Sequence, residues 1–114
     1  MWRATINSWA GLKAAARSEA AFREELIALA LSIPLALYIT PLAWKRLALI
    51  GVILLLIVVE LLNTAIEKLS DHVTAAHDPD IGRIKDISSA AVGVALAIAG
   101  LTWLMAMAEW LGLI

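Results

Sequence analysis

The chain of 114 residues is strongly apolar and nearly neutral, with 62% hydrophobic and 17% charged residues, a mean hydropathy of +0.88 and a formal net charge of −1. A water-soluble domain of this length cannot cover so much apolar surface, so the composition indicates an all-α integral membrane protein built as one unit over residues 1–114. The charge balance argues against nucleic acid as a partner, and the lack of cysteine excludes disulfides and thiolate metal sites.

Residues 1–24 are predicted to form an amphipathic helix that lies in the membrane interface. Its apolar face carries Trp2, Ile6, Trp9 and Ala16 at helical spacing. Basic side chains surround that face: Arg3, Lys13, Arg17 and Arg23. An ordinary amphipathic helix packed on protein is the alternative, and we do not expect a signal peptide because no continuous apolar core is present. Glu19 stands out, because a helix that only adheres to a membrane needs no acid there.

Three stretches are predicted to cross the membrane: residues 26–42, 47–66 and 87–108. Thr40-Pro41 should end the first helix, because the residue before proline disfavours the helical region. Residues 72–84 are predicted to form the one long loop, since the His-Asp-Pro-Asp sequence within them is typical of turns.

Basic residues set the expected orientation. The N-terminal segment and the borders of the 72–84 loop hold seven of them, against Lys45 and Arg46 in the turn between the first two spans. The N-terminus and the loop are therefore expected in the cytoplasm, and the C-terminus outside.

Residues 58–71 hold the main candidate functional residues. On a helix, one face of this segment holds Glu60, Asn63, Thr64, Glu67 and Asp71. Residues 47–59 before it are uncharged, so Glu60 lies where a membrane helix leaves the hydrocarbon, and a carboxylate at that depth indicates a functional site. A helix end with a solvated acidic face is the alternative.

Such a cluster has the parts for phosphoryl transfer from a nucleotide to a lipid alcohol. Two carboxylates can hold Mg²⁺ with substrate phosphates, a lysine can meet a phosphate, and a half-buried carboxylate can take a proton from a hydroxyl. The chain has neither a P-loop nor the glycine-rich loop of protein kinases. From the residues alone, a small channel subunit or a non-catalytic structural oligomer remains in competition.

Residues 60–71, ELLNTAIEKLSD, resemble the signature E-x-[LIVM]-N-[ST]-A-[IL]-E-x-x-x-D of the prokaryotic diacylglycerol kinase family. Residues 19–23, EAAFR, and 85–92, KDISSAAV, resemble two further blocks of that family. The resemblance covers nearly the whole chain, in the same order of surface helix and three spans. It implies a homotrimeric enzyme of the bacterial inner membrane that transfers the γ-phosphoryl group of MgATP to diacylglycerol. Gram-positive relatives prefer undecaprenol, which is the alternative substrate.

The resemblance also implies roles for individual residues. Glu60 would be the general base on the lipid hydroxyl, Asn63 would position it or the phosphate, and Glu19 and Glu67 would bind Mg²⁺ with the nucleotide. The remaining nucleotide contacts would be Ser8, Asp71, Ala76, His77, Asp78, Lys85 and Asp86. Residues along the lipid would be Phe22, Arg23, Arg46, Ser89 and Trp103, together with Glu60.

Two departures from the family pattern concern the nucleotide. The N-terminus is shorter than in familiar members, so Arg3 is only a candidate for a basic nucleotide contact. The loop at 76–78 lacks the expected aromatic residue, which puts the adenine contacts in doubt. Independently of the resemblance, three thin spans cannot shield Glu60 and Asn63 from lipid on every side, so an oligomer is expected.

Overall fold

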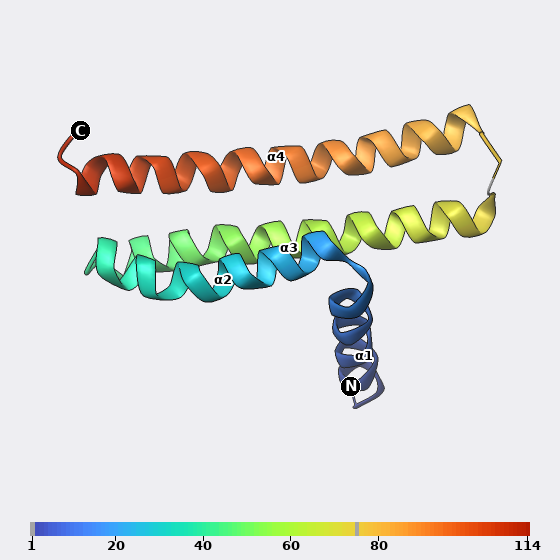
Figure 1. Cartoon of the computed structure of the whole chain (residues 1–114), viewed down its shortest axis with the longest axis horizontal. Coiled ribbons are helices and arrows are strands. Elements are labelled where there is room, and N and C mark those ends of the chain that lie inside the picture. The colour runs from blue at the N-terminus through green and yellow to red at the C-terminus, as the bar shows by residue number, and fades with distance from the viewer. Residues whose placement is uncertain (1, 75) are drawn as a thin grey trace.

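The protein is described by a computed structural model covering residues 2–74 and 76–114. This part of the chain forms α1 (Trp2–Ser18), α2 (Ala20–Ile39), α3 (Ala43–Val73) and α4 (Pro79–Trp110). Helices α2 and α4 both run along α3 to make an elongated bundle, whereas α1 points away from its side (Figure 1). The all-helical architecture agrees with the predicted fold class.

The surface helix is shorter than the predicted range of 1–24, because α1 ends at Ser18 and residues 20–24 form the start of α2. Glu19 has extended backbone angles between them, with φ −114° and ψ 110°. The guanidinium of Arg23 donates to the carbonyl oxygens of Ala16 and Arg17 at 3.1 and 3.0 Å, which satisfies acceptors left open at the end of α1. This local capping favours a break that the hydrophobic pattern alone does not indicate.

The break is held against the bundle by a small core. Phe22 is 2% exposed and packs with Ala15 of α1 and Ile57 of α3. One aromatic ring therefore joins the surface helix, the start of α2 and the middle of α3. The packing positions Glu19 at the junction of these three helices.

The helix end predicted at Thr40-Pro41 is confirmed, but the turn is shorter than predicted, because Lys45 and Arg46, which were placed in it, lie at the start of α3. Helix α2 ends at Ile39, and Thr40 is extended before Pro41, with φ −143° and ψ 140°. The side chain of Arg46 donates to the carbonyl oxygens of Thr40 and Leu37 at 2.7 and 3.1 Å. The same end of the bundle holds an ion pair between Lys45 and Glu109, which ties α3 to the end of α4.

The prediction of a long loop over residues 72–84 was wrong. Helix α3 continues through Val73 and α4 already begins at Pro79. Asp78 caps α4 by accepting from the backbone nitrogens of Asp80 and Ile81 at 2.9 and 3.2 Å, and proline suits the first helical position. The two long helices thus extend past the apolar region, which brings Asp71 and Lys85 together as an ion pair.

Burial in this chain is reversed relative to a soluble bundle. Large apolar side chains such as Leu101 and Leu104 are more than 60% exposed, whereas Glu60, Asn63 and Ser88 are at most 9% exposed. Helices α3 and α4 are long and apolar enough to cross a membrane, and they contain the predicted spans 47–66 and 87–108. The span predicted over 26–42 lies mostly in α2, and its crossing of the membrane stays a prediction.

Candidate active site

A hydrogen-bonded chain of polar side chains joins α3 to α4 inside the bundle. Ser88 Oγ donates to Asn63 Oδ1 at 2.8 Å, and Asn63 Nδ2 lies 3.4 Å from Glu67 Oε1, to which it donates. Asn63 and Ser88 are both buried, so these bonds satisfy groups that would otherwise be costly to bury. The Asn63 amide is oriented from both sides, and the Glu67 carboxylate is held one turn along the same helix.

Glu60 lies one turn before Asn63 on the same face of α3 and is 9% exposed. The carboxylates of Glu67 and Glu19 are both close enough to interact electrostatically with it. Three of the predicted site acids, from α3 and from the α1–α2 junction, therefore gather in one region. This proximity could not be derived from residue spacing, because Glu19 is far from Glu60 along the chain.

A fourth carboxyl, that of Glu25, belongs to the same region and was not predicted. It precedes the uncharged stretch of α2, and its Oε2 atom is buried without a hydrogen-bond partner among the described residues. Burial raises the pKa of Glu25 from the usual 4.5 to about 7, and the nearby Glu60 and Glu24 carboxylates add to the effect. Its place directly before the predicted span is the only sequence signal that could have drawn attention to it.

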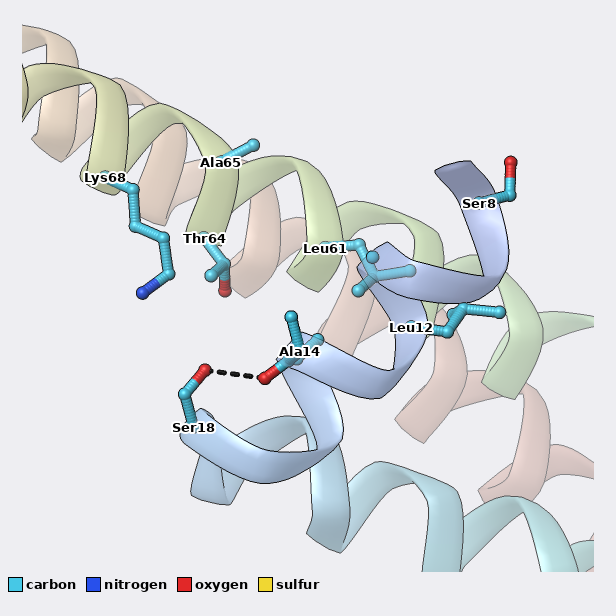
Figure 2. A pocket seen from close by; sticks show the side chains of 10 residues that line it. Ser8, Leu12, Ala14, Ser18, Leu61, Thr64, Ala65 and Lys68 are labelled. Atoms are coloured by element: carbon cyan, nitrogen blue, oxygen red, sulfur yellow. Dashed lines mark hydrogen bonds between the residues drawn. The ribbon is translucent and has the colours of Figure 1, made fainter. Parts of the chain in front are cut away.

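Glu19 has a cationic neighbour on α3. The Lys68 ammonium lies 3.3 Å from Glu19 Oε1, in an ion pair whose side chains are 63% and 29% exposed respectively. Lys68 also lines a pocket of about 500 Å³ between α1 and α3, which Ser8 and Ser18 line from the other side. In Figure 2 the Lys68 side chain extends from α3 toward Ser18, while Ser8 lies farther along α1.

The predicted nucleotide residues of the α3–α4 connection come together in a second pocket of about 350 Å³. Its lining includes Asp71, Ala76, His77, Asp78 and Lys85. Lys85 and Asp71 are ion-paired, and Asp78 is occupied as the helix cap. Asp86 is exposed beside Lys85 and is not among the lining residues of this pocket. The pocket joins residues of both helix ends and offers both charge signs to a ligand.

Four of the residues predicted to lie along the lipid have structural partners within the chain. Phe22 is buried in the core, and Arg23 and Arg46 bond to carbonyl oxygens at helix ends. Trp103 Nε1 donates to the Leu49 carbonyl oxygen at 3.0 Å, whereas Ser89 is exposed on α4. These contacts explain how the side chains are held, and their contacts with lipid stay predictions.

The acids fit a Mg²⁺ ion that arrives with a nucleotide better than a metal held by protein alone. Within residues 2–74 and 76–114 there is no group of three or more acidic, histidine or cysteine side chains that could hold a metal ion. Mg²⁺ bound with nucleotide phosphates needs only one or two carboxylates, because phosphate and water supply the other ligands. Glu19 and Glu67 are the two carboxylates predicted for such a metal, and each has a polar neighbour, Lys68 for Glu19 and Asn63 for Glu67.

Sequence reasoning missed Ser88 and Lys68 as well as Glu25. Ser88 was noted only as part of the KDISSAAV block, and its bond to Asn63 spans 25 positions of sequence. Lys68 lies within the signature at a position that the signature leaves open. A helical projection of residues 60–71 could have found it, because Lys68 follows Thr64 by one turn.

Comparisons with known proteins identify the family of this chain. Residues 6–107 match the model of the family described as prokaryotic diacylglycerol kinase. The diacylglycerol kinase of Escherichia coli K12 is 41% identical over 101 residues, covering 89% of this chain and 83% of the relative. Those of Pseudomonas aeruginosa and Haemophilus influenzae are 42% and 36% identical, over 88% and 87% of this chain and 81% and 84% of the relatives. With its helical architecture and buried polar site, the chain belongs to the prokaryotic diacylglycerol kinase family.

Proposed function

We propose that this membrane protein is an ATP-dependent diacylglycerol kinase that makes phosphatidic acid. The observation that carries the proposal is the buried Ser88–Asn63 pair, which is hydrogen-bonded to the exposed Glu67 carboxylate and lies beside the buried Glu60 carboxylate. A buried acid at the apolar boundary, next to an oriented amide and a second acid, matches what transfer from a water-borne nucleotide to a lipid hydroxyl requires.

In the proposed reaction, Glu60 accepts the proton of the lipid hydroxyl as its oxygen bonds to the γ-phosphorus of ATP. The bond between that phosphorus and the β,γ-bridging oxygen breaks, and ADP leaves. Asn63 can hold Glu60 and the γ-phosphoryl group in the correct relative position, because its amide is hydrogen-bonded through both its oxygen and its nitrogen. The apolar surroundings of Glu60 would limit water and so favour the lipid hydroxyl as acceptor.

Glu19 and Glu67 are the residues that would hold Mg²⁺ brought by ATP. The metal would neutralise charge on the phosphates and orient them for in-line transfer. Asp71, Lys85 and the residues of the 76–78 connection would bind the rest of the nucleotide. Ser8 and Asp86 belong to the same proposed site, as contacts contributed from α1 and from α4.

We further propose a homotrimer in the bacterial inner membrane, with the N-terminus and the α3–α4 connection in the cytoplasm. The orientation follows from the excess of basic residues at that end. An oligomer would cover apolar and polar faces that a single chain leaves exposed, whereas Glu60 and Asn63 are already buried within one chain.

The decisive experiment is a phosphorylation assay on the purified protein in mixed micelles. Diacylglycerol, ATP and Mg²⁺ should give phosphatidic acid and ADP in equal amounts. Undecaprenol in place of diacylglycerol tests the alternative substrate, and preferential phosphorylation of undecaprenol would replace the proposed one. Transfer to neither lipid would favour a non-catalytic membrane oligomer.

Glu60→Gln isolates the proposed base, because it keeps the shape of the side chain and removes its basicity. Loss of the base should reduce turnover by about 10²–10⁴-fold. Nucleotide binding should survive, since binding of MgATP relies on other residues. Turnover within a few-fold of the parent would show that Glu60 is not the base. Loss of MgATP binding would instead move it into the nucleotide site.

A further inference from the structure

Lys68 and a divalent cation would both bind the Glu19 carboxylate. Lys68 Nζ lies 3.3 Å from Glu19 Oε1, where it neutralises the acid that is proposed to bind Mg²⁺. Two cations beside one carboxylate repel each other, so a metal ion on Glu19 would weaken the Lys68 contact. Lys68, which lies within the signature segment, would therefore compete with the proposed metal ion for the Glu19 carboxylate.

The Lys68 side chain can move away from Glu19. The Lys68 side chain is 63% exposed and flexible, and it lines the 500 Å³ pocket between α1 and α3. Figure 2 shows its amine extending from α3 toward Ser18. A lysine ammonium that leaves Glu19 can donate to a phosphate oxygen, for which lysine is a common partner.

We propose that Lys68 couples metal binding to nucleotide binding, by competing with a divalent cation for Glu19 and by contacting the nucleotide phosphates when the metal takes its place. The inference rests on the proposed function, because it takes Glu19 as a metal ligand. A free metal ion then binds weakly to Glu19, because it must displace the Lys68 ammonium. A metal ion that arrives with a polyphosphate binds well, because the phosphates accept a hydrogen bond from the displaced ammonium. By linkage, the metal improves nucleotide affinity by the same factor.

The test uses Mn²⁺, followed by electron paramagnetic resonance, and a non-hydrolysable ATP analogue, at constant ionic strength and without lipid. Lys68→Met should raise the affinity for free Mn²⁺ by up to about five-fold, the upper range for an exposed ion pair. It should weaken binding of the analogue in the presence of Mn²⁺ by about ten-fold or more, as expected for a lost charged hydrogen bond. Lys68→Arg keeps the charge and should restore most of the coupling.

Lys13→Met is the matched control, because Lys13 lies on α1 over the Trp9 ring at 5.5 Å and has no carboxylate partner among the described ion pairs. It removes one positive charge at a residue outside the pocket lining and should change neither affinity. The inference is overturned if Lys68→Met changes neither affinity. It is also overturned if Lys13→Met changes both affinities in the same directions as Lys68→Met does. If the parent protein itself binds no nucleotide with Mn²⁺, the nucleotide site of the proposed function fails instead.

Discussion

Ser88→Ala tests whether the hydrogen bond between α4 and α3 positions the proposed active site. The substitution removes one hydroxyl and leaves almost the same volume, so no sizeable cavity forms. Asn63 Oδ1 then loses its donor at 2.8 Å while it remains buried. An unsatisfied buried acceptor costs about 1–3 kcal/mol.

The Asn63 amide cannot relieve this loss by flipping. A flipped amide would turn its oxygen toward the Glu67 carboxylate, which now accepts from Nδ2 at 3.4 Å, and two acceptors would face each other. The amide is therefore expected to lose its fixed position. If about 1.4 kcal/mol of the penalty also appears in the transition state, turnover falls about ten-fold.

Lipid phosphorylation and thermal unfolding should be measured on the same purified variant. We expect turnover to fall ten-fold or more, with a smaller change in the KM for ATP, and the melting temperature to drop. Thr102→Ala is the control on the same helix, because its hydroxyl donates only to the Ile98 carbonyl oxygen of its own helix at 2.7 Å. Parental turnover in Ser88→Ala, or equal losses in both variants, would refute a positioning role for Ser88.

Glu19→Gln and Glu67→Gln should each lower turnover and raise the Mg²⁺ concentration needed for half-maximal activity; an unchanged Mg²⁺ dependence in both would count against a metal role. Glu25→Gln should make stability less dependent on pH. Because the pKa of Glu25 is raised to about 7, the folded protein keeps a proton that the unfolded chain releases near 4.5, so stability falls as pH rises between these values. Unfolding curves from pH 5 to 8 should show the parent losing about 1 kcal/mol relative to the variant, a value reduced for partial exposure, and parallel curves would contradict the assignment.

Much of the fold could be predicted because its signals are local. The long apolar runs predicted α3 and α4, and Thr40-Pro41 predicted the end of α2. The helical face that runs from Glu60 to Asp71 followed from periodicity within one segment. The family signature added a chemical interpretation to residues that periodicity had already placed on one face.

The predicted helix ends were wrong where a capping contact determines where a helix begins or ends. The break at Glu19 depends on Arg23 reaching back to carbonyl oxygens of α1, a contact between residues six and seven positions apart. The short α3–α4 connection depends on Asp78 as a cap, although Asp78-Pro79 also suits an ordinary turn. The Ser88–Asn63 bond and the Lys68–Glu19 pair depend on how helices pack, which hydrophobic periodicity does not determine.

Helix α3 sets the order of the proposed site residues along its own axis. At about 1.5 Å per residue, Glu67 lies about 10 Å from Glu60 along the helix axis, and Asp71 lies about 6 Å farther. The buried acid thus faces the apolar region, the acid proposed for the metal comes next, and the pocket of Asp71 and Lys85 lies at the polar end. A lipid hydroxyl, a γ-phosphoryl group and a nucleoside need this same sequence if the lipid is to stay in the membrane while ATP stays in water. A single continuous helix can therefore align both substrates, while Ser88 and the α1–α2 junction fix the side chains that lie between them.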